Sequence, residues 1–148
     1  MKFTIFLLAI ATALGQEPSP PQEDLTRIEA EPNLEKRAQF ALDNAGEALK
    51  QAREAYAKGE DASANARLDE VQRSVELADA ALKQTGKNPS RSPKHFKQAE
   101  LRSRDLLRKL DSFRDQMSVA DRASAERVVE AVQKIHDAWL DGIMGKKK

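Results

Sequence analysis

The chain has 148 residues and a formal net charge of +1 at pH 7, because its 25 Lys and Arg residues nearly balance its 24 Asp and Glu residues. Such a balance argues against a nucleic-acid-binding domain, which usually carries an excess of basic residues. The chain contains no cysteine, which excludes disulfides, thiolate zinc sites and thiol catalysis.

The first fifteen residues have the layout of a secretory signal peptide. Lys2 is followed by an apolar run from Phe3 to Leu14, then by Gly15 and the polar Gln16. Because this run is too short to span a bilayer comfortably, we expect residues 1–15 to be cleaved, and an uncleaved anchor is the alternative. Cleavage would remove Lys2 and no acid, which leaves 24 basic and 24 acidic residues. The pattern predicts a secreted or periplasmic protein without stable membrane insertion.

Residues 16–32 read QEPSPPQEDLTRIEAEP, which holds four of the six prolines and an acidic excess. This composition is typical of an extended, flexible linker, with room for a short helical turn around Leu25 and Ile28. After Pro32 the composition changes to Ala, Leu, Glu, Lys, Arg and Gln, which favour helices. Strand signals are absent from this part, since β-branched residues are few and do not alternate with polar ones.

Four long helices are predicted after the linker, at residues 33–58, 61–85, 92–117 and 119–143. In each, apolar residues recur alternately every four and three positions, as in the series Ala38, Leu42, Ala45, Leu49, Ala52 and Tyr56. Gly59 and Gly86 supply C-cap positions, and Ser92 followed by Pro93 predicts the start of the third long helix. Gly46 lies inside the first of them, where a close helix contact and a kink are both open explanations.

The mean apolar step near 3.5 residues predicts an all-α fold, an up-down-up-down antiparallel four-helix bundle with left-handed, heptad-like packing, as in a coiled coil. The bundle would occupy residues 33–145, and a basic tail at residues 146–148 would follow it. The stretch AREAYAKGE resembles the end of a helix in a tetratricopeptide repeat. No 34-residue period accompanies it, so we prefer the bundle.

The sequence contains no recognisable set of catalytic, cofactor-binding or metal-binding residues. His95 and His136 are too far apart to form a His-x-x-x-His pair, and no Gly-rich phosphate loop or Gly-x-Ser-x-Gly turn is present. A haem-carrying bundle is a specific alternative, but the chain lacks Cys-x-x-Cys-His and its first long helix has no methionine. We therefore expect no cofactor and no enzymatic activity.

The stretch KNPSRSPKHFK at residues 87–97 is rich in basic residues and has no acidic one. In an up-down-up-down bundle this loop lies at the same end as the C-terminus, which reads GIMGKKK. The basic end, a candidate contact for an anionic partner, comprises Lys87, Arg91, Lys94, His95, Lys97, Lys146, Lys147 and Lys148. Two non-functional explanations stay open. The lysines compensate helix C-terminal dipoles, or they are neutralised by the linker acids Glu17, Glu23, Asp24, Glu29 and Glu31.

These features predict an exported, non-catalytic helical bundle with an interaction or structural role. Its expected partner is an unknown protein or an anionic component of the cell envelope, and nucleic acid is not expected. The alternative is a secreted or periplasmic carrier that holds a small ligand or cofactor in the bundle interior. Self-association is also open, because Leu107, Val129 and Leu140 lie beside the main apolar stripes.

Overall fold

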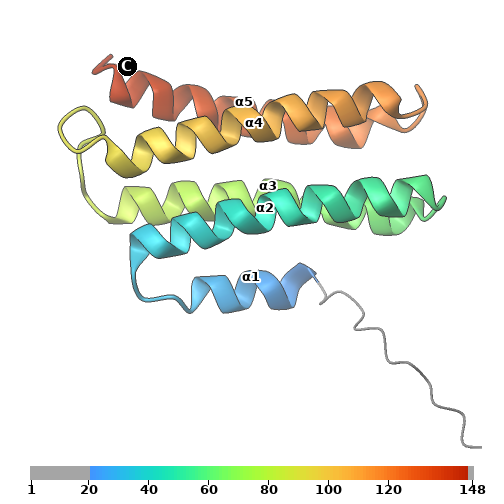
Figure 1. Cartoon of the computed structure of the whole chain (residues 1–148), viewed down its shortest axis with the longest axis horizontal. Coiled ribbons are helices and arrows are strands. Elements are labelled where there is room, and N and C mark those ends of the chain that lie inside the picture. Colours follow the sequence, from blue (N-terminus) through green and yellow to red (C-terminus); the bar gives the residue numbers. More distant parts are fainter. Residues whose placement is uncertain (1–20, 147–148) are drawn as a thin grey trace, which may run out of the picture.

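The computed structural model describes residues 21–146, and every regular element in this range is a helix. The predicted signal peptide and the last two residues of the basic end, Lys147 and Lys148, lie outside the described residues. The helices are α1 (Pro21–Glu29), α2 (Leu34–Ala57), α3 (Asp61–Gln84), α4 (Lys94–Gln116) and α5 (Arg122–Ile143). The all-α prediction is therefore confirmed for this part of the chain, and the helices form a bundle (Figure 1).

The long helices end where the sequence places the glycines. Gly59 and Gly86 have φ angles of +77° and +68°, the left-handed conformation that ends a helix. The start of α4 differs from the prediction, because Ser92 does not cap it and the helix begins after Pro93. The preceding loop folds back on Asn88 instead, whose carbonyl oxygen accepts a 2.8 Å hydrogen bond from the Ser92 N–H.

Helix α1 is a fifth helix where the sequence predicts a flexible linker. Leu25 is only 7% exposed, and Ile28 packs against the core. The turn after α1 is tied to α2, since the Arg37 Nε donates a 2.9 Å hydrogen bond to the carbonyl oxygen of Glu31. The predicted helical turn around Leu25 and Ile28 is part of a nine-residue helix, so the flexible linker does not extend over residues 21–29. Contacts with α2 and α3 stabilise this helix, and its one proline, Pro21, stands at the first helical position, where proline is tolerated.

The four long helices form two antiparallel hairpins, α2 with α3 and α4 with α5 (Figure 1). The hairpins stack so that α2 lies beside α4, and α3 lies beside α5, with each of these pairs running parallel. Helices α3 and α4 follow each other in the sequence and run in opposite directions. Among the pairs of long helices in contact, however, this pair has the smallest contact. They are diagonal partners, which the extended loop at residues 85–93 makes possible.

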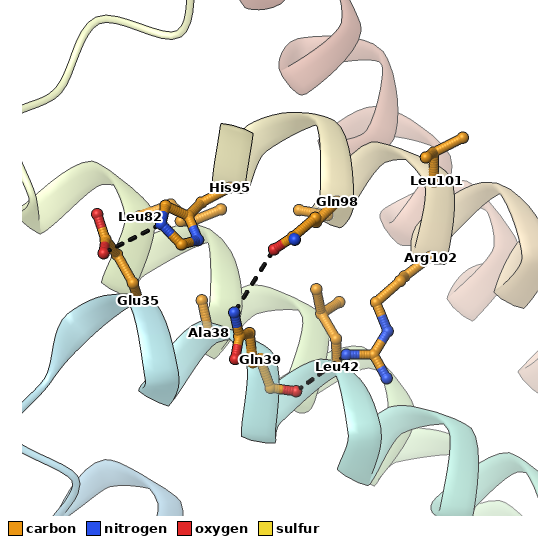
Figure 2. Close-up of a pocket in the computed structure, with 10 residues that line it drawn as sticks. Glu35, Ala38, Gln39, Leu42, Leu82, His95, Gln98, Leu101 and Arg102 are labelled. Atoms are coloured by element: carbon orange, nitrogen blue, oxygen red, sulfur yellow. Dashed lines mark hydrogen bonds and ion pairs between the residues drawn. The ribbon is translucent and has the colours of Figure 1, made fainter. Parts of the chain in front are cut away.

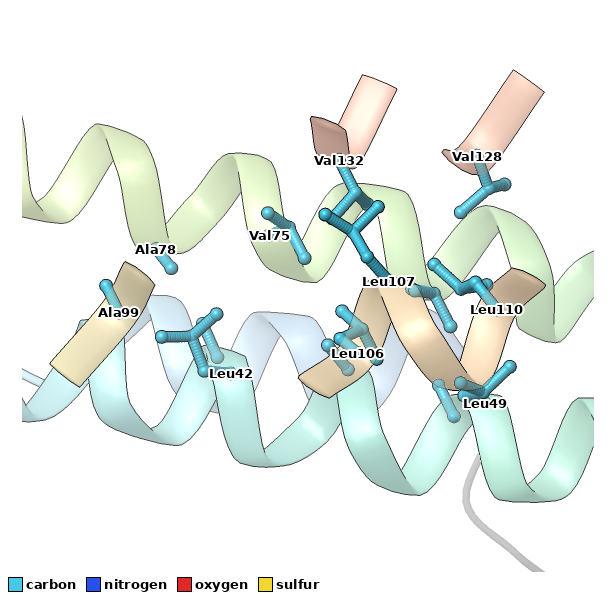
Figure 3. Close-up of a cluster of buried hydrophobic side chains, with 14 of the residues drawn as sticks. Leu42, Leu49, Val75, Ala78, Ala99, Leu106, Leu107, Leu110, Val128 and Val132 are labelled. Atoms are coloured by element: carbon cyan, nitrogen blue, oxygen red, sulfur yellow. The ribbon is translucent and has the colours of Figure 1, made fainter. Parts of the chain in front are cut away.

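The core is filled from all four long helices. Its largest fully buried apolar side chains are Phe113, Leu49, Leu68, Leu82, Leu110, Val71, Val75, Val128 and Val132. Figure 3 shows Leu106, Leu107 and Leu110 of α4 directed into this cluster, with Leu107 next to Val132 of α5. Leu107 is only 7% exposed and Val129 packs against the core, so these two do not form the free self-association surface that the sequence suggested.

Most neighbouring helices are also joined by buried or half-buried polar contacts. Between α2 and α3, Asn44 Nδ2 donates to Glu70 Oε1 at 3.0 Å and to Ser74 Oγ at 2.9 Å. Between α3 and α5, Trp139 Nε1 donates to Asp79 Oδ1 at 3.0 Å. Such contacts fix the register of each pair, because a shift by one turn would leave buried polar groups without partners.

Candidate functional site

Four pairs of neighbouring helices form the sides of the bundle: α2 with α3, α4 with α5, α3 with α5, and α2 with α4. Of these, α2 and α4 have the least extensive contact. Two of the polar contacts between them are exposed and long: Gln39 Nε2 donates to Gln98 Oε1 at 3.5 Å, and Arg53 Nη2 donates to Gln116 Oε1 at 3.4 Å. Arg102 also pairs with Asp43 at the surface. Exposed pairs of this kind contribute about 1 kcal/mol or less, so α2 and α4 are joined mainly by the apolar residues beneath them.

A groove follows this seam. It consists of three hollows of about 450, 310 and 460 Å³. The first and second share Leu42, Leu101 and Arg102, and the second and third share Gly46 and Lys109, so the three are continuous. From Glu35 to Glu54 the groove follows twenty residues of α2, or about 28 Å along the helix axis at a rise of 1.5 Å per residue.

This α2–α4 groove has an apolar floor and polar edges. Its floor and walls include Ala38, Leu42, Leu49, Leu82, Ala99 and Leu106, and its polar edge residues include Glu35, Gln39, Asp43, Lys50, Arg53, Gln98, Arg102, Asp105 and Lys109. Leu101 stands at its edge with 56% of its surface exposed. An apolar floor beneath mixed charges is suited to the apolar face of another helix.

The first hollow, shown in Figure 2, lies next to the basic end. His95 Nε2 on α4 is 3.1 Å from Glu35 Oε2 at the start of α2, while the other ring nitrogen, Nδ1, is buried without a hydrogen-bond partner. Lys87 also pairs with Glu35. This hydrogen bond from Lys87, with His95 and Lys94 nearby, lowers the pKa of the Glu35 carboxyl below its ordinary value. The Glu35 carboxylate therefore lines the first hollow and at the same time binds Lys87 in the loop before α4.

The structure brings the described part of the basic end together. The loop packs on the end of α5, where a Cβ added at Gly142 would lie 3.1 Å from Pro89 Cγ. Lys146 Nζ is 3.8 Å from Asp141 Oδ1, so this lysine has a local partner. Arg91, Lys94 and Lys97 are exposed and form no ion pair within the described residues.

The predicted neutralising acids do not perform that task where they are described. Asp24 pairs with Arg27 inside α1, and the Glu31 carboxylate accepts a hydrogen bond from the Asn33 N–H. Glu35, which the sequence does not distinguish from other helix-surface acids, is the carboxylate that meets Lys87 and His95. Its position in the first turn of α2 brings it to the same end of the bundle as the loop.

A second polar cluster is buried between α4 and α5. Ser103 Oγ is 2.9 Å from His136 Nδ1, and Glu100 Oε1 is 3.6 Å from His136 Nε2. This serine, histidine and glutamate have the residue types of a hydrolytic triad, but the Ser103 hydroxyl donates its only proton to the Glu100 carbonyl oxygen at 2.9 Å. We therefore assign Nδ1 as the donor to Ser103, which is the reverse of a base that activates a nucleophile.

Burial supports a structural role for this cluster. Ser103 is fully buried, and Glu100 and His136 are 5% and 7% exposed. A hydroxyl in that position has no path to a substrate, whereas its hydrogen bonds join α4 to α5. The sequence does not indicate this contact, because Ser103 and His136 lie 33 positions apart and meet only when α4 packs on α5. Within residues 21–146 no group of three or more His, Cys, Asp or Glu side chains is arranged to bind a metal ion.

Comparison with known proteins adds no relative. No protein-family model matches the chain, and neither a curated protein nor a solved structure is similar to it. Across the described part of the chain, no helix has the length and apolar character needed to cross a bilayer.

Proposed function

We propose that this protein is a non-catalytic interaction module that acts outside the cytoplasm and binds its partner in the α2–α4 groove. The observation that carries the proposal is the continuous groove along one seam of the bundle, with Leu101 exposed at its edge. The expectation of export rests on the N-terminal apolar segment. The mixed charges on both edges of the groove favour a protein partner over a ligand of one charge sign.

Replacing Leu101 with glutamate tests the groove as the binding surface. A carboxylate at this edge opposes burial of an apolar partner face, so we expect at least a tenfold loss of affinity, which corresponds to about 1.4 kcal/mol. The mature chain is immobilised, exposed to the extracytoplasmic fraction of its source, and the captured proteins, this chain included, are quantified by mass spectrometry.

Val119→Glu is the matched control for this experiment. Val119 is 80% exposed and lies in the turn between α4 and α5, away from the groove. Both substitutions add a carboxylate to an exposed apolar position, and circular dichroism checks that both variants remain helical. Equal capture by the wild-type chain and the Leu101→Glu variant would show that the groove is not the binding surface.

Ligand carriage in the bundle interior is less well supported. The interior is occupied by fully buried side chains such as Phe113, Leu110 and Val75. A ligand of useful size would have to displace these side chains or separate the helices, at a cost of several kcal/mol. The large hollows along the α2–α4 seam lie at the surface of the bundle, where they suit a macromolecular partner.

The second candidate is contact with an anionic surface through the basic end. The specific observation that favours it is that Arg91, Lys94 and Lys97 are exposed without ion-pair partners in the described chain. Lys94 and Lys97 lie in the first turn of α4, where positive charges oppose the helix dipole and are not needed for folding.

Vesicle binding tests this candidate. Replacing both Lys94 and Lys97 with glutamine should weaken binding to phosphatidylglycerol vesicles about tenfold or more, since each lysine near an anionic surface contributes about 1 kcal/mol. Replacing Lys58 and Lys134 with glutamine removes the same charge away from the basic end and should have less effect. Co-sedimentation at several salt concentrations measures the difference, and equal losses in both variants would exclude the basic end as a specific contact.

A further inference from the structure

Gly46 has no explanation within its own chain. It lies in the middle of α2 without a positive φ angle, and a Cβ added there would meet nothing within 4 Å. A glycine inside a helix costs about 1 kcal/mol relative to alanine. A close contact with another helix of the described chain does not account for it, since the added Cβ meets no atom there, and α2 continues through this position from Leu34 to Ala57. A glycine facing open space is what a second backbone would need in order to approach closely.

Gly46 is also the point where the charge on the groove edge of α2 changes sign. Glu35 and Asp43 line the groove before it, and Lys50 and Arg53 line it after it. Glu54 follows Arg53 at the far end, so the second half is basic in balance rather than purely basic. When the charge of a surface changes sign at its centre, a second copy rotated by half a turn places its basic half on the acidic half of the first.

Building on the groove assigned above, we propose that its occupant is a second copy of this chain. The two α2 helices cross antiparallel at Gly46, so that Asp43, three residues before the crossing, faces Lys50 of the second copy, four residues after it. Because a twofold rotation relates the two copies, the Asp43–Lys50 pair forms twice in the dimer. Partly buried, duplicated charge pairs of this kind fix the orientation of a symmetric interface.

The apolar edge of the groove fits the same arrangement. Leu101 lies at the level of Leu42, with which it lines two hollows, and so it faces the basic half of the second α2. The aliphatic stems of Lys50 and Arg53 of the second copy can cover Leu101 while their charged ends reach the acidic half of the first. Arg102 already pairs with Asp43 within the chain at the surface, and in the dimer this carboxylate accepts from both.

A membrane or a strongly acidic protein fits this surface less well. Such a partner would compete with Glu35 and Asp43 for the cations that these acids already pair with. The second copy instead brings cations to the acidic half of the groove and carboxylates to the basic half. A partner helix from another protein would need the same sign reversal at its centre. The symmetry of the charges about Gly46 therefore favours self-association over both.

Charge exchange at the two paired positions tests the dimer directly. The Asp43→Lys variant places lysine against Lys50, and the Lys50→Asp variant places aspartate against Asp43, so each variant alone should dimerise at least tenfold more weakly than the wild type. A mixture of the two restores both pairs and should form a heterodimer. Light scattering and sedimentation of the full mature chain over a dilution series measure these states, and thermal unfolding confirms that each variant is folded.

A single cysteine at the crossing point gives an independent measurement. The chain has no cysteine, so Gly46→Cys under mild oxidation should form a disulfide-linked dimer faster than Ala80→Cys, an exposed position on α3. A wild-type chain that stays monomeric, or a mixture that dimerises no better than each variant alone, would overturn self-association. The capture experiment distinguishes this failure from a failure of the groove itself. If the chain does not self-associate but the Leu101→Glu substitution abolishes capture of another protein, the groove is the binding surface and its occupant is that protein.

Discussion

Replacing Phe113 with alanine is expected to lower the free energy of unfolding by about 3–5 kcal/mol, a large part of the stability of a domain of this size. Phe113 is 2% exposed and belongs to the core cluster, in the last turn of α4. Its ring also meets Tyr56 edge to face, with centroids 5.7 Å apart and an interplanar angle of 78°. The substitution removes both the buried area and this aromatic contact, and it leaves a cavity that rigid helices fill only in part.

The effect should extend to the turn between α4 and α5. The Tyr56 hydroxyl donates to Asp121 Oδ2 at 3.0 Å and accepts from the Ser118 N–H at 2.9 Å, so the ring that Phe113 supports also orders this turn. Urea unfolding followed by circular dichroism measures the loss, with the slope of free energy against urea expected to stay unchanged. Phe40→Ala is the control, because Phe40 is 44% exposed and its loss should cost about 0.5 kcal/mol. A similar cost for both phenylalanines would contradict the core described here.

The helix positions could be predicted from the sequence because their signals are local. The apolar periodicity marks which face of each helix is buried, and Gly59 and Gly86 mark two ends through a backbone conformation that glycine adopts easily. Local signals are weaker for α1, whose described side chains reach the core at Leu25 and Ile28. A nine-residue helix of this kind depends on tertiary contacts, which the sequence alone does not show.

The arrangement of the helices could not be predicted, because a periodic stripe does not say which helix it faces. The α2–α4 groove exists because these two helices are neighbours and contact each other loosely. Gly46 is one sign of the groove in the sequence, because a glycine inside a helix is unfavourable and has no local role there. Leu101 is a second sign, since it is an apolar residue outside the regular apolar series of α4, and it is exposed in the fold.

The buried acids were missed for a related reason. Glu70 and Glu100 have the sequence surroundings of ordinary surface acids, with basic residues a few positions away on the same helix. They are 1% and 5% exposed in the fold. Their remaining partners, Asn44 and His136, belong to other helices and are distant in the sequence. Burial of a charge becomes evident only when the packing that forces its pairing is known.

Of these two acids, Glu70 supports the sharper expectation: replacing Arg67 with methionine should destabilise the protein by about 3 kcal/mol or more. Arg67 Nη1 donates to Glu70 Oε2 at 2.7 Å, and the Arg67 side chain is 11% exposed. Without the guanidinium, the carboxylate keeps its hydrogen bond from Asn44 but has lost its positive partner in a site that excludes water. The buried carboxylate without a cation raises the free energy of the folded state, whereas in the unfolded chain the same carboxylate is hydrated by water.

The double variant separates this charge effect from lost packing. Replacing Glu70 with methionine as well removes the buried charge, so the Arg67→Met/Glu70→Met protein should recover most of the loss and unfold within about 1 kcal/mol of the wild type. Arg102→Met is the matched control, since its pair with Asp43 is exposed on both sides and should contribute about 0.5 kcal/mol. Urea unfolding of the wild type, the two single variants Arg67→Met and Glu70→Met, and the double variant completes the cycle. A double variant no more stable than Arg67→Met would mean that Arg67 stabilises α3 through its packing and other contacts, and that the charge of Glu70 is tolerated without it.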